Sequence, residues 1–520
     1  MKRVKRVLAL LAALALVLAM AVPAWAEEGT CSITAPNNRH NYEVYQIFTG
    51  TLSEDNGTKV LSDIKWGKNG TNGDTAVTEG DSVPEAVLND ITRVATKPDS
   101  EKLAVIEKYV NLKGEKFTTV NSGTTQNVPA GYYLIKDADN SYDDQHDAYT
   151  QFIVEVAGKV IFQPKTDYPT VEKKVQENSK TTDTTGDYGE KYNDVADYSI
   201  GDAVPFKLIG SVPDMSQYST YKYTFHDTLA ESLKAPAQAD VKVYISSDKA
   251  GSDKQDITSN FTVTVSGQKI TVHTDNLKTI TDSADKYILV EYSAVLNSKA
   301  AINKENVTGT SNGNINKVYL TYSNNPRNES EAGKTPEDTV IVFTYKIEAT
   351  KVDGETNENL KGVTFRIYKM SDDKKLYAQV ADGKLNGWVK PADANNNCVL
   401  TSGEDGKFSL AGLDDGTYFI EEITPLPGYN SIDPVQIQVN GNTSNGQNGN
   451  GATSELAGVT FTVGGESQNA IIIVNNAGTT LPSTGGMGTT VFYVVGGGSA
   501  GDQEADGEQA LNQTPKQKIS

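Results

Sequence analysis

Residue types that carry most enzymatic chemistry are few in this sequence and isolated from one another. The four histidines lie far apart in the chain: His40, His146, His226 and His273. No HExxH, CxxC or Walker sequence occurs, so the spacings typical of zinc proteases, thiol redox proteins and nucleotide-binding enzymes are missing. The sequence therefore predicts a protein that is not a turnover enzyme and uses no cofactor.

Two stretches rich in acidic residues or asparagine could offer oxygen ligands to Ca²⁺. Residues 186–202 read GDYGEKYNDVADYSIGD, and residues 393–397 read DANNN. Neither stretch has the ligand spacing of an EF-hand loop. We therefore interpret both as solvated loops and predict no metal site.

The N-terminus has the three parts of a secretory signal peptide. Basic residues precede an apolar core over 7–22, and Ala24-Trp25-Ala26 forms a small-x-small cleavage site. The apolar core is short for a membrane span, which argues against a retained anchor. We expect residues 1–26 to be removed and the chain to be exported.

The net charge limits the kinds of molecule that the chain could bind, and the cysteine content limits how far disulfides could stabilise it. The formal net charge of −20 and the pI near 4.7 disfavour nucleic acid and anionic lipid as partners. Exported domains that depend on disulfides usually carry many cysteines, whereas this chain has only Cys31 and Cys398. Whether these two pair is left open, and any resistance to stress must have another source.

Apolar residues after residue 27 alternate mostly with period two, which is typical of half-buried strands. Helical three- and four-residue spacing occurs only over 83–94 and 100–112. The pattern predicts a mainly β protein of tandem immunoglobulin-like β-sandwiches, with a small helical insert in the first. Linker-like composition places the three domains at 27–168, 169–340 and 341–480. The best predicted strands are 41–50, 131–137 and 149–156, then 221–229, 287–296 and 318–326, then 340–354, 363–369 and 470–476.

Several segments resemble one family of exported proteins. Leu481-Pro482-Ser483-Thr484-Gly485 matches the LPxTG sorting motif of Gram-positive surface proteins, which a sortase cleaves between Thr and Gly. Residues 154–165, VEVAGKVIFQPK, resemble the pilin motif of major (backbone) pilins. Further segments resemble their A-type second domain and their collagen-binding-protein B-type last domain: PTVEKKV (169–175), YTFHDTL (223–229), KVDGETNENLKGVTFRIYK (351–369) and GTYFIEEITPLPGY (416–429).

The resemblance implies a structural subunit of a covalently polymerised surface pilus. In such pilins a lysine amine of one subunit attacks the acyl-sortase at the threonine of the next. The matching residues are Lys165 as the amine and Thr484 as the acyl donor; Gln163 departs from the tyrosine usual two residues before that lysine. The implied partners are a pilus-specific sortase, other copies of the chain, tip and base pilins, and a host surface ligand.

Domains of this family often contain an internal Lys–Asn isopeptide bond, formed once and without turnover beside an acid. Burial lowers the pKa of the lysine so that it can attack, and a protonated carboxyl polarises the amide. In the second domain strand parity turns Lys173 inward and Lys174 outward, and favours Asn324 over Asn325. With Asp227 as the matching acid, Lys173, Asn324 and Asp227 form the predicted set.

In the third domain the same parity argument selects Lys351, Asn475 and Glu422, the last in preference to Glu421. Bonds of this kind are expected to join the first and last strands of each domain. The first domain has Ile135 and Lys136 where the third has its acid, so we predict no internal bond there. A softer first domain would leave Lys165 easier for a sortase to reach.

An alternative function is a single-copy wall-anchored or ancillary adhesin that binds a host ligand. Such a protein would not use Lys165 and would usually carry a binding head, for which 83–112 is the only obvious candidate. A secreted hydrolase ranks last because no nucleophile–base–acid set is present.

The tail after the sorting motif departs from the family pattern. The apolar run Thr489–Val495 is too short to span a bilayer and is followed by Gly496–Gly498 and an acidic tail. A frameshift after Gly498 explains this change better than a natural variant that is released to the medium. The expected location is the cell surface, linked in the pilus and the cell wall.

Overall fold

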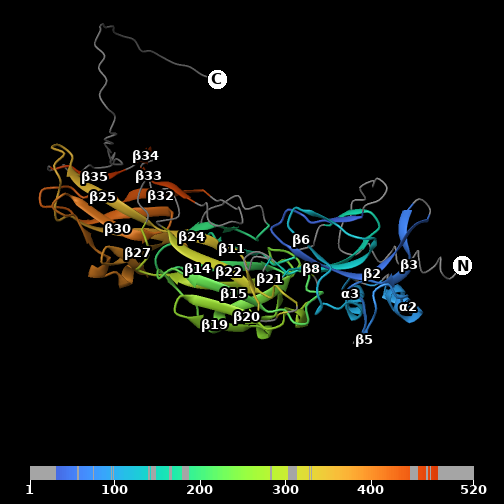
Figure 1. The fold of residues 1–520 in the computed structure, drawn as a ribbon. Helices are drawn as coiled ribbons and strands as arrows, with labels where there is room; N and C mark the ends of the chain where they lie inside the picture. The colour runs from blue at the N-terminus through green and yellow to red at the C-terminus, as the bar shows by residue number, and fades with distance from the viewer. Residues whose placement is uncertain are drawn as a thin grey trace, which may run out of the picture.

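The structure is a computed structural model. It describes residues 31–477, apart from 56–57, 74, 95–96, 98, 139–140, 142–147, 163–166, 179–186, 282–283, 303–312, 327, 329–330, 445–454, 464–465 and 469. The predicted signal peptide, Lys165, the sorting motif with Thr484, and the C-terminal tail therefore lie outside the described residues. Among the helices that are described, none is long and apolar enough to cross a membrane. Three strand-rich units follow one another along an elongated molecule (Figure 1), and the predicted mainly β fold is confirmed.

The first unit is built on one antiparallel sheet with a core on each face. The sheet has the order β3-β2-β8-β9, with β6 paired to β2. Tyr132 and Leu134 of β8 belong to the core beneath the helices α2 and α3, whereas Tyr133 and Ile135 belong to the core beneath a small sheet β10-β1-β7. The helical insert therefore packs on the body of the domain. The bounds are β1 (Ser32–Thr34), β2 (Tyr42–Asp55), β3 (Thr58–Trp66), α2 (Glu85–Val94), α3 (Asp99–Ile106), β6 (Thr118–Val120), β7 (Thr125–Asn127), β8 (Gly131–Asp137), β9 (Gln151–Val156) and β10 (Lys159–Ile161).

The second unit is a sandwich of two sheets. One has the order β12-β11-β14-β21-β17-β18 and the other β13-β24-β22-β15-β20-β19. In the first sheet the strands are β11 (Val171–Gln176), β12 (Tyr192–Asn193), β14 (Ala203–Ser211), β17 (Lys242–Ser246), β18 (Gln255–Asp256) and β21 (Tyr287–Leu296). In the second they are β13 (Val195–Asp197), β15 (Tyr223–Leu229), β19 (Thr262–Ser266), β20 (Lys269–Thr274), β22 (Asn314–Tyr322) and β24 (Asp338–Phe343).

The third unit is one continuous sheet, in which the first and last strands of the unit along the chain, β25 and β35, lie side by side. Its order is β34-β33-β32-β31-β26-β27-β28-β30-β25-β35, and the short strand β29 (Leu400–Thr401) pairs with β26 as the eleventh strand. Strand β25 pairs with β35 in parallel. The bounds are β25 (Tyr345–Asp353), β26 (Thr364–Ser371), β27 (Lys374–Ala381), β28 (Lys384–Val389), β30 (Lys407–Leu413), β31 (Gly416–Thr424), β32 (Val435–Ser444), β33 (Glu455–Val463), β34 (Glu466–Gln468) and β35 (Ile471–Asn475).

The boundary between the second and third units lies at Thr344, not between residues 340 and 341 as predicted. Residues 341–343 belong to β24, which pairs with β13 and β22 of the second unit. The apolar run 340–343 is buried and leads directly into β25, so sequence alone does not show where one strand ends. The two units also share one continuous core, and Ile200 N donates to Gly412 O at 2.9 Å across the junction.

The two cysteines do not pair. Cys31 lies at the start of the first unit and Cys398 is buried in the third, beside Tyr368 and Tyr377. The question that the sequence left open is therefore answered: no disulfide stabilises the chain.

Candidate functional site

Lys173 is completely buried inside the second sandwich, which is unusual for a lysine. It lies on β11 with Val171 and Val175, whose side chains turn to the same inner face. Its backbone N–H donates to Asp338 Oδ2 at 2.6 Å, which fixes β11 against the opposite sheet. The inward direction predicted from strand parity is therefore correct.

The ammonium group of Lys173 faces the buried carboxyl of Asp227. Nζ lies 2.7 Å from Asp227 Oδ1, and both side chains are inaccessible to solvent. The rings of Phe206 and Tyr292 lie 5.4 Å and 5.5 Å from Nζ. Burial lowers the pKa of Lys173 to about 8, against the opposing effect of Asp227. The lysine is thus shifted toward the neutral form that can act as a nucleophile.

The amide nearest this pair belongs to Asn316. The hydroxyl of Tyr292 accepts from Lys173 Nζ at 3.1 Å and from Asn316 Nδ2 at 2.8 Å. Asn316 is fully buried on β22, and its Oδ1 accepts no hydrogen bond from the described residues. One hydroxyl group therefore holds the amine and the amide together.

Asn324, the predicted partner, is not brought to Lys173. Asp227 pairs with Val318 across the sheet, and Asn324 lies six residues further on, about 20 Å along the strand direction. Its carbonyl accepts from Tyr149 N of the first domain at 2.7 Å, so it lies at the domain junction. Strand parity predicts which face of the sheet a side chain points to, but not its position along the strand. Asn316 and Asn324 are separated by an even number of residues, so parity assigns both to the same face and cannot distinguish them. The selection of Asn324 is therefore wrong in this structure.

Lys174 differs from its predicted exposure. It faces away from Lys173, as parity requires, but it is also fully buried. Its Nζ contacts Asp194 and lies 4.5 Å from the centre of the Tyr188 ring. The segment around Tyr188 and Asp194 covers the outer face of β11, which the strand pattern could not reveal.

The third domain brings all three of its predicted residues together. Lys351 is fully buried on β25 and pairs with Ile473 of the parallel strand β35, while Asp353 pairs with Asn475. Lys351 Nζ donates to the carbonyl of Ile473 at 3.2 Å. Burial lowers the pKa of Lys351 to about 8, although nearby Glu422 and Asp353 favour its charged form.

Glu422 contacts the asparagine directly. Asn475 Nδ2 donates to Glu422 Oε1 at 3.2 Å and to Oε2 at 3.0 Å, and burial raises the pKa of Glu422. Glu421, the rejected alternative, pairs instead with Lys375 at 2.9 Å and with Tyr377 at 2.6 Å. The inward turn expected of Glu422 agrees with these contacts.

The remaining predicted sites are placed as follows. In the first domain Lys136, which takes the place of the acid, pairs with Glu43 at 2.7 Å. In the stretch 186–202 Asp197 lies with Glu177 and Asp415, with ligand atoms within 4.8 Å of one another. Acidic clusters are common without an ion, so this cluster alone indicates no metal site.

Comparisons with known proteins match two of the three units. Residues 200–326 match a family described as Gram-positive pilin backbone subunit 2, Cna-B-like domain. Residues 345–451 match the SpaA family, described as a prealbumin-like fold domain. The A type assigned to the second domain from sequence stays a prediction, since the matching family is described as Cna-B-like.

Individual relatives are more distant. The trypsin-resistant surface T6 protein of Streptococcus pyogenes serotype M6 is 25% identical over 396 residues, which cover 64% of this chain and 66% of that protein. The alignment thus spans just under two thirds of that relative. Among solved structures, the T6 backbone pilin of S. pyogenes is 15% identical with a TM-score of 0.48, covering 88% of this chain and all of that one. The full-length major pilin RrgB of Streptococcus pneumoniae is 14% identical with a TM-score of 0.41, covering 88% and 95%.

The two domain matches cover parts of the second and third units and include Asp227, Asn316, Lys351 and Glu422, but they stop short of Lys173 and Asn475. The second unit therefore carries a domain of the Gram-positive pilin backbone family, and the third unit carries a SpaA-type prealbumin-like domain.

Proposed function

We propose that copies of this chain are joined by a pilus-specific sortase through Lys165 and Thr484 and become linked to the cell wall. The choice of Lys165 is supported by its place between two consecutive strands, β10 of the first domain and β11 of the second. β10 ends at Ile161 and β11 begins at Val171, so Lys165 belongs to the segment that connects the first two domains. A nucleophilic amine in such a connection can be reached by an enzyme without unfolding either domain. Tip and base pilins and a host surface ligand are further proposed partners.

Co-expression with a pilus-type sortase tests this linkage. We expect a ladder of high-mass species that survives boiling in SDS and is lost in Lys165→Ala and in Thr484→Ala. Lys159→Ala is the matched control, because Lys159 is an exposed lysine on the adjacent strand β10. A ladder that persists in Lys165→Ala would exclude Lys165 as the acceptor.

We further propose that each of the last two domains forms an internal Lys–Asn bond: Lys173 with Asn316 beside Asp227, and Lys351 with Asn475 beside Glu422. The ammonium passes a proton to the carboxylate, the neutral amine attacks the amide carbon Cγ, and ammonia leaves. The observation that carries this proposal is the fully buried Lys173, held between a carboxyl and a hydroxyl that also binds an asparagine.

Electrostatics favour the linked product. A buried ion pair is costly because neither charge is hydrated, and geometry must compensate for that loss. The linked product contains a neutral amide and a neutral carboxylic acid, so both charges leave the core. An unlinked Lys173–Asp227 pair would keep them there.

Mass spectrometry of the full chain tests both bonds. We expect the intact mass to fall short of the sequence mass by two ammonia molecules, and digestion to yield peptides that join Lys173 to Asn316 and Lys351 to Asn475. Asn316→Ala should restore one ammonia, whereas Asn324→Ala should restore none. The reverse result would reinstate Asn324 as the partner of Lys173.

A further inference from the structure

The hydroxyl of Tyr292 lies at the centre of the second-domain cluster and contacts every other member. Besides Lys173 Nζ at 3.1 Å and Asn316 Nδ2 at 2.8 Å, it contacts Asp227 Oδ2. Tyr292 lies on β21, in the same sheet as β11, while Asp227 and Asn316 come from the opposite sheet. The hydroxyl therefore stands between the attacking nitrogen, the acid and the leaving nitrogen.

The two clusters differ in how the acid reaches the amide. In the third domain Glu422 accepts directly from Asn475 Nδ2 through both carboxyl oxygens. In the second domain, within the described residues, the side chain of Asp227 forms hydrogen bonds only with Lys173 and Tyr292. A proton that leaves Asp227 for the nitrogen of Asn316 must therefore pass through the tyrosine hydroxyl.

We propose that Tyr292 is a catalytic residue that relays this proton during formation of the Lys173–Asn316 bond. The inference rests on the internal bond proposed above. In the structure the hydroxyl accepts from Lys173 Nζ and donates to Asp227 Oδ2, so the ammonium first passes a proton through it to Oδ2. This leaves neutral Lys173 and Asp227 protonated on Oδ2. Nζ bonds to Cγ of Asn316 and gives a proton to Asp227 Oδ1. Tyr292 gives its proton to Nδ2 and takes the proton of Asp227 Oδ2. The Cγ–Nδ2 bond then breaks, ammonia leaves, and both Tyr292 and Asp227 end protonated.

The order of events agrees with the hydrogen bonding before reaction. An amide nitrogen donates hydrogen bonds and accepts none, so Asn316 Nδ2 first donates to the hydroxyl. After attack Nδ2 becomes a tetrahedral amine with a lone pair, and the hydroxyl can rotate to donate to it. Burial, together with the nearby Asp227, raises the pKa of Tyr292 well above its ordinary value. The hydroxyl therefore keeps the proton that it must give.

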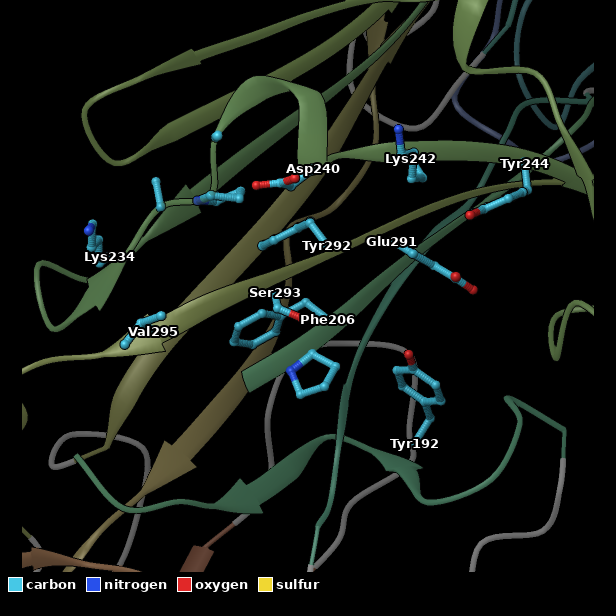
Figure 2. Close-up of a pocket in the computed structure, with 14 residues that line it drawn as sticks. Tyr192, Phe206, Lys234, Asp240, Lys242, Tyr244, Glu291, Tyr292, Ser293 and Val295 are labelled. Atoms are coloured by element: carbon cyan, nitrogen blue, oxygen red, sulfur yellow. The ribbon is translucent and has the colours of Figure 1, made fainter. Parts of the chain in front are cut away.

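The ring of Tyr292 is fixed by packing and lies near solvent. It stacks on Phe206 with ring centres 5.5 Å apart. Both rings line a surface pocket of about 540 Å³ beneath the segment that carries Lys234 and Asp240, as Figure 2 shows. The same two rings thus line the pocket and have their centres 5.4 Å and 5.5 Å from Lys173 Nζ.

Tyr292→Phe in the full chain tests the relay, because it removes the hydroxyl and keeps the ring. The chain is refolded, and the peptide joining Lys173 to Asn316 is quantified over time by mass spectrometry. General acid–base groups typically contribute about 10²–10⁴-fold, so we expect bond formation to slow by at least about tenfold. The Lys351–Asn475 peptide in the same sample should form at the wild-type rate and so reports on folding.

Tyr223→Phe is the matched control. Tyr223 is another buried tyrosine of the same sandwich, and its hydroxyl donates to the carbonyl of Ser211 at 2.8 Å, outside the cluster. It should leave the rate of linkage unchanged. If Tyr292→Phe does not fold, 3-fluorotyrosine at position 292 keeps the hydroxyl but makes it more acidic. We then expect an altered rate of linkage in a normally folded chain.

The outcomes separate this inference from the proposed bond. Linkage at the wild-type rate in Tyr292→Phe, or in the folded fluorotyrosine chain, would overturn the relay and leave the bond intact. A wild-type chain with no Lys173–Asn316 peptide would instead refute the bond itself.

Discussion

Lys351 and Asn475 lie on adjacent parallel strands, displaced by two residues in register. These strands, β25 and β35, are the first and last of the third domain. A bond between the two side chains would connect the points where the chain enters and leaves the domain. Tension along the pilus would then pass through the bond and not through the eleven-stranded sheet.

Loss of this bond should lower the stability of the third domain strongly. In Asn475→Ala the loop of about 125 residues is no longer closed, and the entropy model for cross-links predicts a loss of about 5 kcal/mol. Thermal unfolding followed by calorimetry measures the effect. Asn476→Ala, at the exposed neighbouring position, should leave the transition unchanged. Equal stability of Asn475→Ala and the wild type would argue against a covalent link.

An unlinked second domain should become more stable as the pH rises from about 8 to about 10. In Asn316→Ala the buried Lys173 keeps a free amine with a pKa of about 8, whereas an unfolded lysine has a pKa of about 10.4. Between these values the unfolded chain binds a proton that the folded chain does not, so stability rises with pH. Below pH 8 both states hold the proton and the slope vanishes.

Urea unfolding across this range measures the slope, and the linked wild type is the control. In the linked wild type the Lys173 nitrogen is part of an amide that does not titrate, so the rise in stability between pH 8 and 10 that the free amine causes should be missing. Identical slopes in the two chains would contradict either the lowered pKa or the link.

Strand parity predicted much of the two clusters from sequence. It turned Lys173, Lys351 and Glu422 inward correctly, because the side-chain period of two is a property of any strand. It failed for Asn324 because sheet register depends on pairing with distant strands. Tyr292 was missed for a related reason: its alternating pattern matches an ordinary core tyrosine, and only the packing of two sheets brings its hydroxyl to the lysine.

The covering of Lys174 and the end of β24 could not be predicted for similar reasons. A distant segment buries Lys174, and the pairing of residues 341–343 with β13 and β22 assigns them to the second domain. The prediction that the bond joins the first and last strands also does not hold in the second domain, because Asn316 lies on β22 and β24 follows β22 as the last strand. In the second domain the bond would join the two sheets of the sandwich.

The first domain should be the least stable of the three. We predict no internal bond in it, and its buried residues are divided into two separate cores on opposite faces of one sheet. Hydrogen exchange should show lower protection for the amides of β8 than for those of β22 or β31. Digestion should give no linked peptides from residues 31–162. Protection of β8 equal to that of the other domains would contradict the prediction.

The position of the second-domain bond determines how far that domain can extend under force. With Lys173 bonded to Asn316, only residues 317–343 lie outside the covalent path, about 27 residues that span about 90 Å when extended. These residues include most of β22 and all of β24, which would separate from β15 and β13 as they are pulled. Single-molecule stretching of the full chain should therefore show a step of at most about 90 Å from this domain. A bond to Asn324 would limit the step to about 65 Å, and Asn316→Ala should release the whole domain over several hundred ångströms. The third domain, linked between its first and last strands, should contribute almost no extension in the same experiment.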